Sequence, residues 1–188
     1  PICVDPDGKP LESIAYVLHN QGYNVGIMTT VPVNHATPAA FYGHNSSRYG
    51  YYEISREIVD SRFEFFGGSG FYHYKGRKGD KPGVDIYIEE NGYDVCYGPK
   101  EFEARNKEKD IVFIQESGRE TNPENYVSDG TEACDVQLAE MLEMGLEVIG
   151  EAVNGEEGFL KYKELRPDIV TMDITMPVMT GLESLLLI

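Results

Sequence analysis

Val25-Gly-Ile-Met-Thr-Thr-Val-Pro-Val-Asn-His-Ala-Thr-Pro-Ala-Ala40 is the stretch that decides the fold. We expect a strand over 24–29, followed by a loop that contains Pro32. Thr37 directly precedes Pro38, a residue suited to the first turn of a helix, so the local sequence favours Thr37 as a helix N-cap. The stretch therefore predicts a strand that leads through a loop into a short helix.

The flanking segments continue this alternation of strand and helix. Apolar residues at helical spacing follow Pro10, and Gly22 is placed to stop that helix. The pattern further predicts helices over 51–59 and 84–91, strands over 63–66, 93–96 and 110–115, and an exposed loop over 75–83. Such alternation is typical of an α/β fold with a mainly parallel sheet flanked by helices.

A second segment begins near residue 142. The pattern predicts a polar loop over 116–132, helices over 135–144 and 155–166, strands over 146–150 and 168–173, and a further helix that begins at Gly181. We therefore expect two partial domains, 1–141 and 142–188.

Charge and hydropathy exclude two classes of partner. The 188 residues carry 32 acidic and 16 basic side chains, a formal charge of -16, which repels nucleic acid and anionic membrane surfaces. No run of about 18 apolar residues is present, so we expect no membrane span.

The three cysteines have no Cys-x-x-Cys spacing and indicate little about the cellular compartment of the protein.

Three side chains near the end of the first strand suit an oxyanion and metal site. The guanidinium of Arg48 can grip two phosphate oxygens, which a lysine cannot imitate. Thr37 offers a hydroxyl to a hard cation such as magnesium, and His35 offers an imidazole to a metal or a metal-bound water. Each residue also has an ordinary interpretation: a helix cap for Thr37, a loop histidine for His35 and a surface side chain for Arg48.

The run His35-Ala-Thr-Pro-Ala-Ala-Phe-Tyr-Gly-His44, with Arg48 thirteen residues after His35, resembles the alkaline phosphatase family. These are metal-dependent phosphomonoesterases built on a large mixed sheet between helices, and the resemblance covers about 1–141. It implies that Thr37 is a magnesium ligand, that His35 lies beside this metal in its second shell, and that Arg48 binds a phosphomonoester or inorganic phosphate. Magnesium and zinc are the cofactors that the family implies.

Two parts of the family's machinery are not found in this sequence. The family's nucleophilic serine lies in an Asp-Ser-Ala triplet, which does not occur here. Glu116-Ser-Gly118 resembles the strand end at which the zinc ligands begin, but Thr121 and Asn125 stand where the family has an aspartate and a histidine. We therefore interpret Glu116 as a residue that only mimics the family's zinc ligand, and it stays a weak candidate for a metal site. The expectation is a phosphate clamp with part of a magnesium site, no catalytic residue and no hydrolysis by this chain alone.

The second segment carries a different phosphate signature. Gly150-Glu-Ala-Val-Asn-Gly155 and Asp173-Ile-Thr-Met-Pro-Val-Met-Thr-Gly181 are very similar to bacterial response-regulator receiver domains, which have a flavodoxin-like fold. The resemblance implies that Asp173 is the phosphoacceptor, with magnesium bound and a histidine kinase as partner. An aspartate that caps the next turn is the ordinary alternative. Asp129, 44 residues earlier, is a weak candidate for the acidic metal pair because Ser128 precedes it, so we expect Asp173 to be a poor acceptor.

Three classes of function stay open. The chain is a fragment of an alkaline phosphatase, a receiver-type signalling module, or a non-functional composite that arose by engineering, by misjoined genes or by truncation. Alkaline phosphatases usually work in the periplasm or outside the cell and receivers work in the cytoplasm, so the two parts imply different compartments. This conflict favours the composite as regards activity, whereas the phosphatase relationship describes the larger part of the chain.

Overall fold

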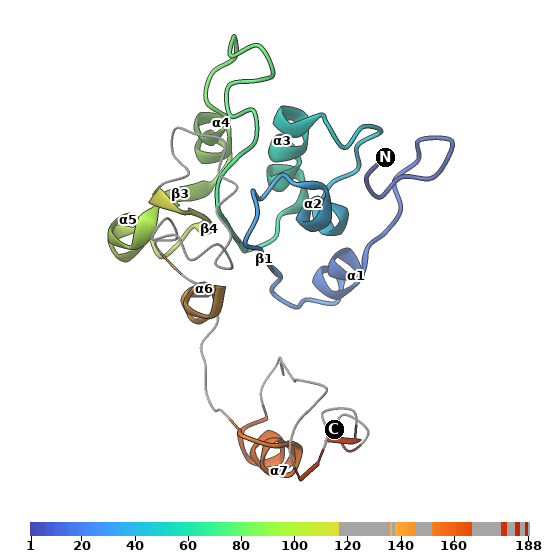
Figure 1. Ribbon diagram of the computed structural model, residues 1–188, viewed down its shortest axis with the longest axis vertical. Coiled ribbons are helices and arrows are strands. Elements are labelled where there is room, and N and C mark those ends of the chain that lie inside the picture. The colour runs from blue at the N-terminus through green and yellow to red at the C-terminus, as the bar shows by residue number, and fades with distance from the viewer. Residues whose placement is uncertain are drawn as a thin grey trace. The chain divides into compact units, whose positions relative to one another are not determined.

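A parallel sheet forms the centre of the larger part of the chain. The computed structural model describes residues 1–116, 136, 138–145, 152–166, 178–179, 183–184 and 187. The chain divides into two compact units, Pro1–Gly145 and Leu146–Ile188. In the first unit, the strands β1 (Gly26–Met28), β2 (Phe65–Gly68), β3 (Tyr93–Tyr97) and β4 (Asp110–Ile114) pair in the order β1-β2-β4-β3, and every pairing is parallel (Figure 1). The predicted α/β fold with a mainly parallel sheet is confirmed.

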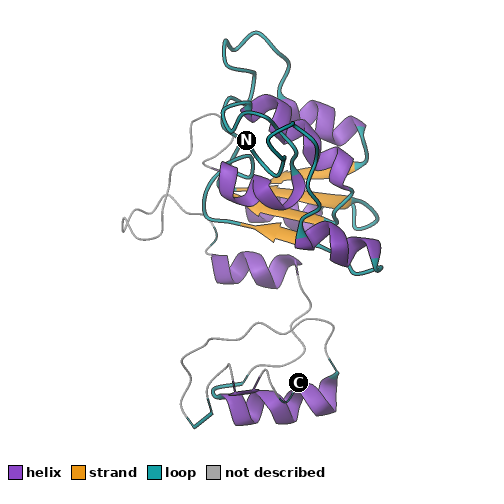
Figure 2. Cartoon of the chain, turned by 90° about the vertical axis from the view of Figure 1, so that its right-hand side faces the viewer, coloured by secondary structure: helices purple, strands orange, loops and turns teal. Residues whose placement is uncertain are grey.

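Helices connect these strands and cover both faces of the sheet (Figure 2). The first unit contains α1 (Ile14–Asn20), α2 (Ala36–Tyr42), α3 (Tyr51–Ser61), α4 (Val84–Glu90), α5 (Gly98–Ala104) and α6 (Leu138–Gly145). None of the helices in the described part of the chain is both long and apolar enough to span a membrane.

The core follows the two-residue alternation of side chains along each strand. Phe66 of β2 and Val112 of β4 are fully buried in a large core on one face, whereas Phe65 and Phe113, one position away, are buried in a smaller core on the other face. The larger core also contains Ile54 and the other buried apolar residues of α3 and α4, and the smaller one contains Phe102 of α5 and Met141 of α6. Because both faces are covered, the strands of the first unit are apolar on both sides.

Two helices begin where the sequence pattern did not place their starts. α1 begins at Ile14 rather than just after Pro10, because the Ser13 side chain accepts the Tyr16 N–H and caps the helix there. α5 was not predicted, since only Pro99 in its first turn and the buried Phe102 distinguish it from a loop. The exposed loop predicted over 75–83 is confirmed.

The loops that follow β1 and β2 are joined to each other by their backbones. Beyond the end of the β1·β2 pairing, Thr29 N–H donates to the Gly67 carbonyl at 2.9 Å, and Ser69 N–H donates to the Val31 carbonyl at 3.1 Å. Val33 N–H then donates to the Gly70 carbonyl at 3.0 Å. The carboxyl ends of parallel strands lie at one edge of the sheet, the edge at which α/β proteins usually bind ligands. These bonds therefore hold both loops at that edge.

The second unit is described around one helix, α7 (Gly155–Leu165). Asn154 caps it by accepting the Glu157 N–H at 2.9 Å, and the Glu157 carboxylate accepts the Val153 N–H at 3.2 Å. Glu157 also pairs with Lys161 at 2.7 Å. The predicted helix over 155–166 is confirmed, with its end one residue earlier. The strands predicted over 146–150 and 168–173, and the loop predicted over 116–132 beyond its first residue, lie outside the described residues.

Gly68 makes the close approach of the two loops possible. A Cβ atom at this position would lie 2.7 Å from Val33 Cγ1 and 2.8 Å from the Val31 carbonyl oxygen. Both contacts are too short, and the second is to backbone, which cannot move aside as the end of a side chain can. Gly68 is therefore required by packing at the carboxyl edge.

We predict that Gly68→Ala lowers the free energy of unfolding by about 1–3 kcal/mol, the usual cost of overpacking a filled interior. Gly26→Ala is the matched control on the neighbouring strand, since the one tight contact of its added Cβ would be the flexible tip of the Met28 side chain, at 3.3 Å, and its contacts with Phe65, at 3.6 and 3.9 Å, are ordinary. Urea denaturation of the two variants and the parent chain measures the difference. Equal stabilities of the two variants would contradict the packing argument.

Candidate functional site

The entry to α2 is organised by His35, not by Thr37. His35 is the N-cap residue, and its Nδ1 accepts the Thr37 N–H at 3.4 Å, while Ala39 N–H donates to the His35 carbonyl at 3.0 Å. The expectation that Thr37 caps the helix is therefore wrong. The helix starts earlier because an imidazole nitrogen can accept a backbone N–H and because Pro38 fits anywhere in a first turn, where N–H groups have no helical partner. The exposed Thr37 hydroxyl consequently has no capping role.

Asn34, the residue before His35, ties three segments together. Its side chain is fully buried. Nδ2 lies 2.8 Å from Ser55 Oγ, 3.0 Å from the Tyr51 carbonyl oxygen and 2.9 Å from the Tyr72 carbonyl oxygen. Oδ1 accepts the Tyr72 N–H at 2.9 Å. One amide therefore joins the loop after β1, the start of α3 and the segment after β2.

Arg48 lies in a turn just before α3. The turn is closed by Asn45, whose Oδ1 accepts the Ser47 N–H at 3.1 Å, and by the Gly50 N–H, which donates to the Ser47 carbonyl at 3.1 Å. The exposed guanidinium of Arg48 has its carbon 5.8 Å from the centre of the Tyr49 ring. Within the part of the chain that the structure describes, it has no carboxylate partner within 4 Å. Its donors are therefore available to an anion.

The bond from Asn34 to Tyr51 also limits the separation of Thr37 and Arg48. Each lies three residues from one end of this bond, so each Cα lies within roughly 11 Å of the Cα at that end, given at most ~3.6 Å per residue. Both residues belong to segments held at the carboxyl edge of β1 and β2. The bond thus joins the segment that carries His35 and Thr37 to the start of α3, three residues after Arg48, and the convergence of the three side chains on one site stays a prediction.

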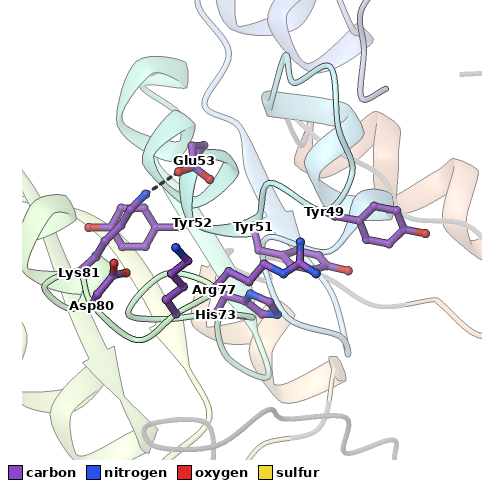
Figure 3. A pocket seen from close by; sticks show the side chains of 9 residues that line it. Tyr49, Tyr51, Tyr52, Glu53, His73, Arg77, Asp80 and Lys81 are labelled. Carbon is purple, nitrogen blue, oxygen red and sulfur yellow. Dashed lines mark hydrogen bonds and ion pairs between the residues drawn. The ribbon is translucent and has the colours of Figure 1, made fainter.

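A surface pocket of about 250 Å³ lies next to this turn (Figure 3). It is lined by residues of the turn, of α3 and of the loop after β2: Tyr49, Tyr51, Tyr52, Glu53, His73, Arg77, Lys78, Asp80 and Lys81. Lys81 Nζ lies 2.6 Å from Glu53 Oε1 and 4.2 Å from the centre of the Tyr52 ring. The hydrogen bond from Lys81 lowers the pKa of the Glu53 carboxyl group. The sequence pattern indicated an exposed loop here but gave no sign that it faces α3.

The described residues supply only part of the metal sites that the resemblance implies. Magnesium prefers oxygen ligands, usually including carboxylates, and zinc sites need at least three protein ligands. Thr37 offers one hydroxyl, and His35 Nδ1 is already occupied by the Thr37 N–H. Among the residues that the structure describes, no group of three or more His, Cys, Asp or Glu side chains converges on one point. The described residues therefore do not fit a complete magnesium or zinc site.

The remaining candidates are separated from this region in the sequence. Glu116 is exposed, just after the carboxyl end of β4, and its Cβ lies against Gly98 at the start of α5. Asp129 and Asp173 lie outside the described residues. The roles predicted for these three carboxylates stay predictions.

Comparisons with known proteins identify the relatives of the first unit. Residues 1–63 match the family model described as alkaline phosphatase. The structure of alkaline phosphatase from the Antarctic bacterium TAB5 is similar, with a TM-score of 0.52 and 28% identity over 60% of this chain and 33% of that one. Alkaline phosphatase from Thermus thermophilus has a TM-score of 0.58 and 25% identity over 76% of this chain and 30% of that one. The predicted phosphatase resemblance is confirmed, and the chain spans about a third of each solved phosphatase.

Curated proteins of a second kind are also similar. Chemotaxis protein CheY of Thermotoga maritima is 66% identical over 41 residues, which are 22% of this chain and 34% of that protein. A protein-glutamate methylesterase/protein-glutamine glutaminase of Clostridium acetobutylicum is 48% identical over 50 residues, 26% of this chain and 14% of that protein. The predicted receiver resemblance is confirmed, again over a fraction of the relative's length. The chain therefore combines partial similarity to two unrelated families.

We predict that Asn34→Ala lowers the free energy of unfolding by about 2–4 kcal/mol, because the buried N–H and carbonyl of Tyr72 both lose their hydrogen bond to the Asn34 amide and each lost bond costs about 1–3 kcal/mol. Tyr51 is less affected, since Ser55 Oγ also donates to its carbonyl. Denaturant titration checks the value.

Asn20→Ala is the control for this substitution, since its amide makes one exposed hydrogen bond, to Glu12. We expect it to cost less than about 1 kcal/mol. A loss in Asn34→Ala no greater than in Asn20→Ala would contradict the role assigned to the buried amide.

Proposed function

We propose that the first unit is the phosphate-binding part of an alkaline-phosphatase-like phosphomonoesterase and that this chain alone binds phosphate without hydrolysing esters. In this proposal Arg48 grips two oxygens of a phosphomonoester or of inorganic phosphate. Thr37 and His35 form the magnesium side of the site, with Thr37 as ligand and His35 in the second shell. The solved TAB5 relatives include a mutant with histidine replaced by aspartate that has magnesium bound.

The observation that carries the proposal is the buried amide of Asn34. It joins the segment of His35 and Thr37 to the start of α3, three residues after Arg48, and to the segment after β2. A bidentate clamp needs an arginine whose backbone is fixed, because its guanidinium must meet two oxygens at once. The hydrogen bonds of the Asn45–Gly50 turn support a fixed backbone at Arg48. Its guanidinium is exposed and has no carboxylate partner among the described residues, so it is available to an anion.

The lack of hydrolysis follows from the chemistry of the family. Its nucleophilic serine stands in an Asp-Ser-Ala triplet, which these 188 residues do not contain. A clamp that binds substrate and transition state equally well lowers the free energy of both and does not accelerate the chemical step. Phosphate affinity without turnover is therefore the expected behaviour.

A second proposal concerns Asp173 and rests on the 66% identity with CheY over 41 residues. We infer that residues 142–188 derive from a receiver and that Asp173 occupies its phosphoacceptor position. A receiver in this role would exchange a phosphoryl group with a histidine kinase. An aspartyl phosphate forms efficiently only when a bound magnesium ion neutralises the incoming charge. Asp129 is the weak candidate that would contribute to holding this ion.

For the clamp we predict that Arg48→Ala weakens the binding of inorganic phosphate at least about tenfold, since a charge-assisted hydrogen bond contributes about 1.5–3 kcal/mol. Arg48→Lys should recover only part of the affinity, because an ammonium cannot bind two oxygens in a fork. Lys107→Ala removes one positive charge from the exposed turn before β4 and should change the affinity little. Isothermal titration calorimetry with phosphate measures all three variants.

The same samples with an aryl phosphate, zinc and magnesium should release no more phenol than a buffer blank. Turnover that disappears in Arg48→Ala would show that a nucleophile is supplied by another residue, and the proposal of binding without hydrolysis would be wrong. Equal phosphate affinities of Arg48→Ala and Lys107→Ala would contradict the proposal that Arg48 binds phosphate.

For the second unit we predict that acetyl phosphate with magnesium produces little aspartyl phosphate, because the acidic pair that holds the metal in receivers is incomplete here. Phosphate-affinity electrophoresis of the parent chain and of Asp173→Asn measures the modified fraction. A slow band of high occupancy in the parent that is absent in Asp173→Asn would contradict the prediction and establish an active receiver.

A further inference from the structure

The pocket next to the Arg48 turn is lined by more cations than carboxylates, although the whole chain is acidic. Three of its lining residues are cations, Arg77, Lys78 and Lys81, and two are carboxylates, Glu53 and Asp80. The whole chain carries a formal charge of -16. A local excess of positive charge on a strongly acidic protein attracts anions to that one place.

Within the described part of the chain, two of the three cations have no carboxylate partner. Lys81 is paired with Glu53 at 2.6 Å and lies over the Tyr52 ring, so its positive charge is already compensated. Arg77 and Lys78 are exposed, and neither has a carboxylate within 4 Å among the described residues. In Figure 3 the side chain of Arg77 lies on the same side of the pocket as His73 and Tyr51. These two cations are the groups that an anion would meet.

The loop that presents Arg77 and Lys78 has a defined backbone. Gly76 N–H donates to the His73 carbonyl at 2.7 Å and Gly79 N–H donates to the Gly76 carbonyl at 3.0 Å, so two turns shape the loop. Lys81 N–H donates to the Lys75 carbonyl at 2.9 Å and closes its base. A loop held in one conformation loses less entropy on binding than a free one.

The pocket also offers an aromatic surface. Tyr51 is packed against Tyr72 and His73, with ring centres 4.9 and 5.2 Å apart, and Lys81 covers one face of Tyr52. Tyr49 is 70% exposed, and its ring meets Tyr51 edge-on. Tyr49 is therefore the tyrosine of the pocket with the most surface free for a planar group.

We propose that this pocket binds an organic phosphate of the nucleotide class, with a phosphate group at Arg77 and Lys78 and the planar base against Tyr49. Its volume of about 250 Å³ is just below the roughly 300–1,000 Å³ of pockets that enclose a drug-sized ligand, which suits a subsite for part of a ligand. The assignment rests on the proposed function in one respect: Arg48, whose guanidinium carbon lies 5.8 Å from the centre of the Tyr49 ring, would hold the phosphate group that the proposed function assigns to it.

Calorimetry with ADP, pyrophosphate and adenosine, in EDTA and at fixed ionic strength, tests the assignment. ADP should bind more tightly than pyrophosphate, and adenosine should bind most weakly. The double variant R77Q/K78Q should weaken ADP and pyrophosphate about tenfold, because charge-assisted hydrogen bonds are lost. Tyr49→Leu should weaken ADP and leave pyrophosphate unchanged.

The matched control is K9Q/K107Q, which removes the same charge from two exposed lysines that do not line the pocket. It should change ADP affinity by no more than about twofold, since exposed charges contribute little at a distance. Equal losses in the two double variants would show diffuse electrostatics and overturn the site. An unchanged ADP affinity in Tyr49→Leu would overturn the nucleotide class.

Failure of the clamp and failure of this pocket give different results. If Arg48→Ala leaves inorganic phosphate binding intact while R77Q/K78Q loses ADP, the proposed function is wrong and the pocket stands. If Arg48→Ala loses phosphate while ADP affinity is equal in R77Q/K78Q and the parent chain, the clamp stands and the pocket is wrong.

Discussion

The arrangement of the first unit depends on the buried amide of Asn34. A fully buried polar side chain without partners would destabilise the fold by several kcal/mol, and here four groups from α3 and from the segment after β2 lie within 3.0 Å of its amide atoms. These partners come from segments that are distant in the sequence. The cost of burying the amide is offset only when all three segments are in place, so a single residue couples the loop after β1 to the start of α3 and to the chain that leads into the basic pocket.

Gly68 and Asn34 together determine how closely the loop after β1 approaches β2. The glycine lets the loop after β1 approach β2 closely, because any Cβ would meet the Val31 carbonyl, and the amide then fixes the approach with hydrogen bonds. Arg48 and the loop that carries Arg77 and Lys78 are thereby attached to one rigid frame. A phosphate site needs such a frame, because a flexible arginine loses conformational entropy when it binds phosphate, and this loss offsets most of the binding free energy.

Much of the fold could be predicted from the sequence because its signals are local. Short segments rich in apolar residues placed β2, β3 and β4, and the Asn154-Gly155 pair placed the start of α7. The predictions that failed concern competition between neighbours: His35 and Thr37 can both cap a helix, and only the observed backbone shows that the imidazole does so. The basic pocket and the role of Asn34 depend on contacts between segments up to 38 residues apart, which no local pattern contains.

The same distinction explains how one chain can resemble two families. Short motifs such as His35-Ala-Thr-Pro38 or Asn154-Gly155 keep their local hydrogen bonds in any context that allows the helix, so they persist in a partial domain. Phosphoryl chemistry instead requires a nucleophile, metal ligands and a clamp from several distant segments at once. Binding makes the weaker demand, because a guanidinium and two cations on a fixed frame suffice for an anion. On this ground we expect the first unit, in the function proposed for it, to bind phosphate more readily than it turns over an ester.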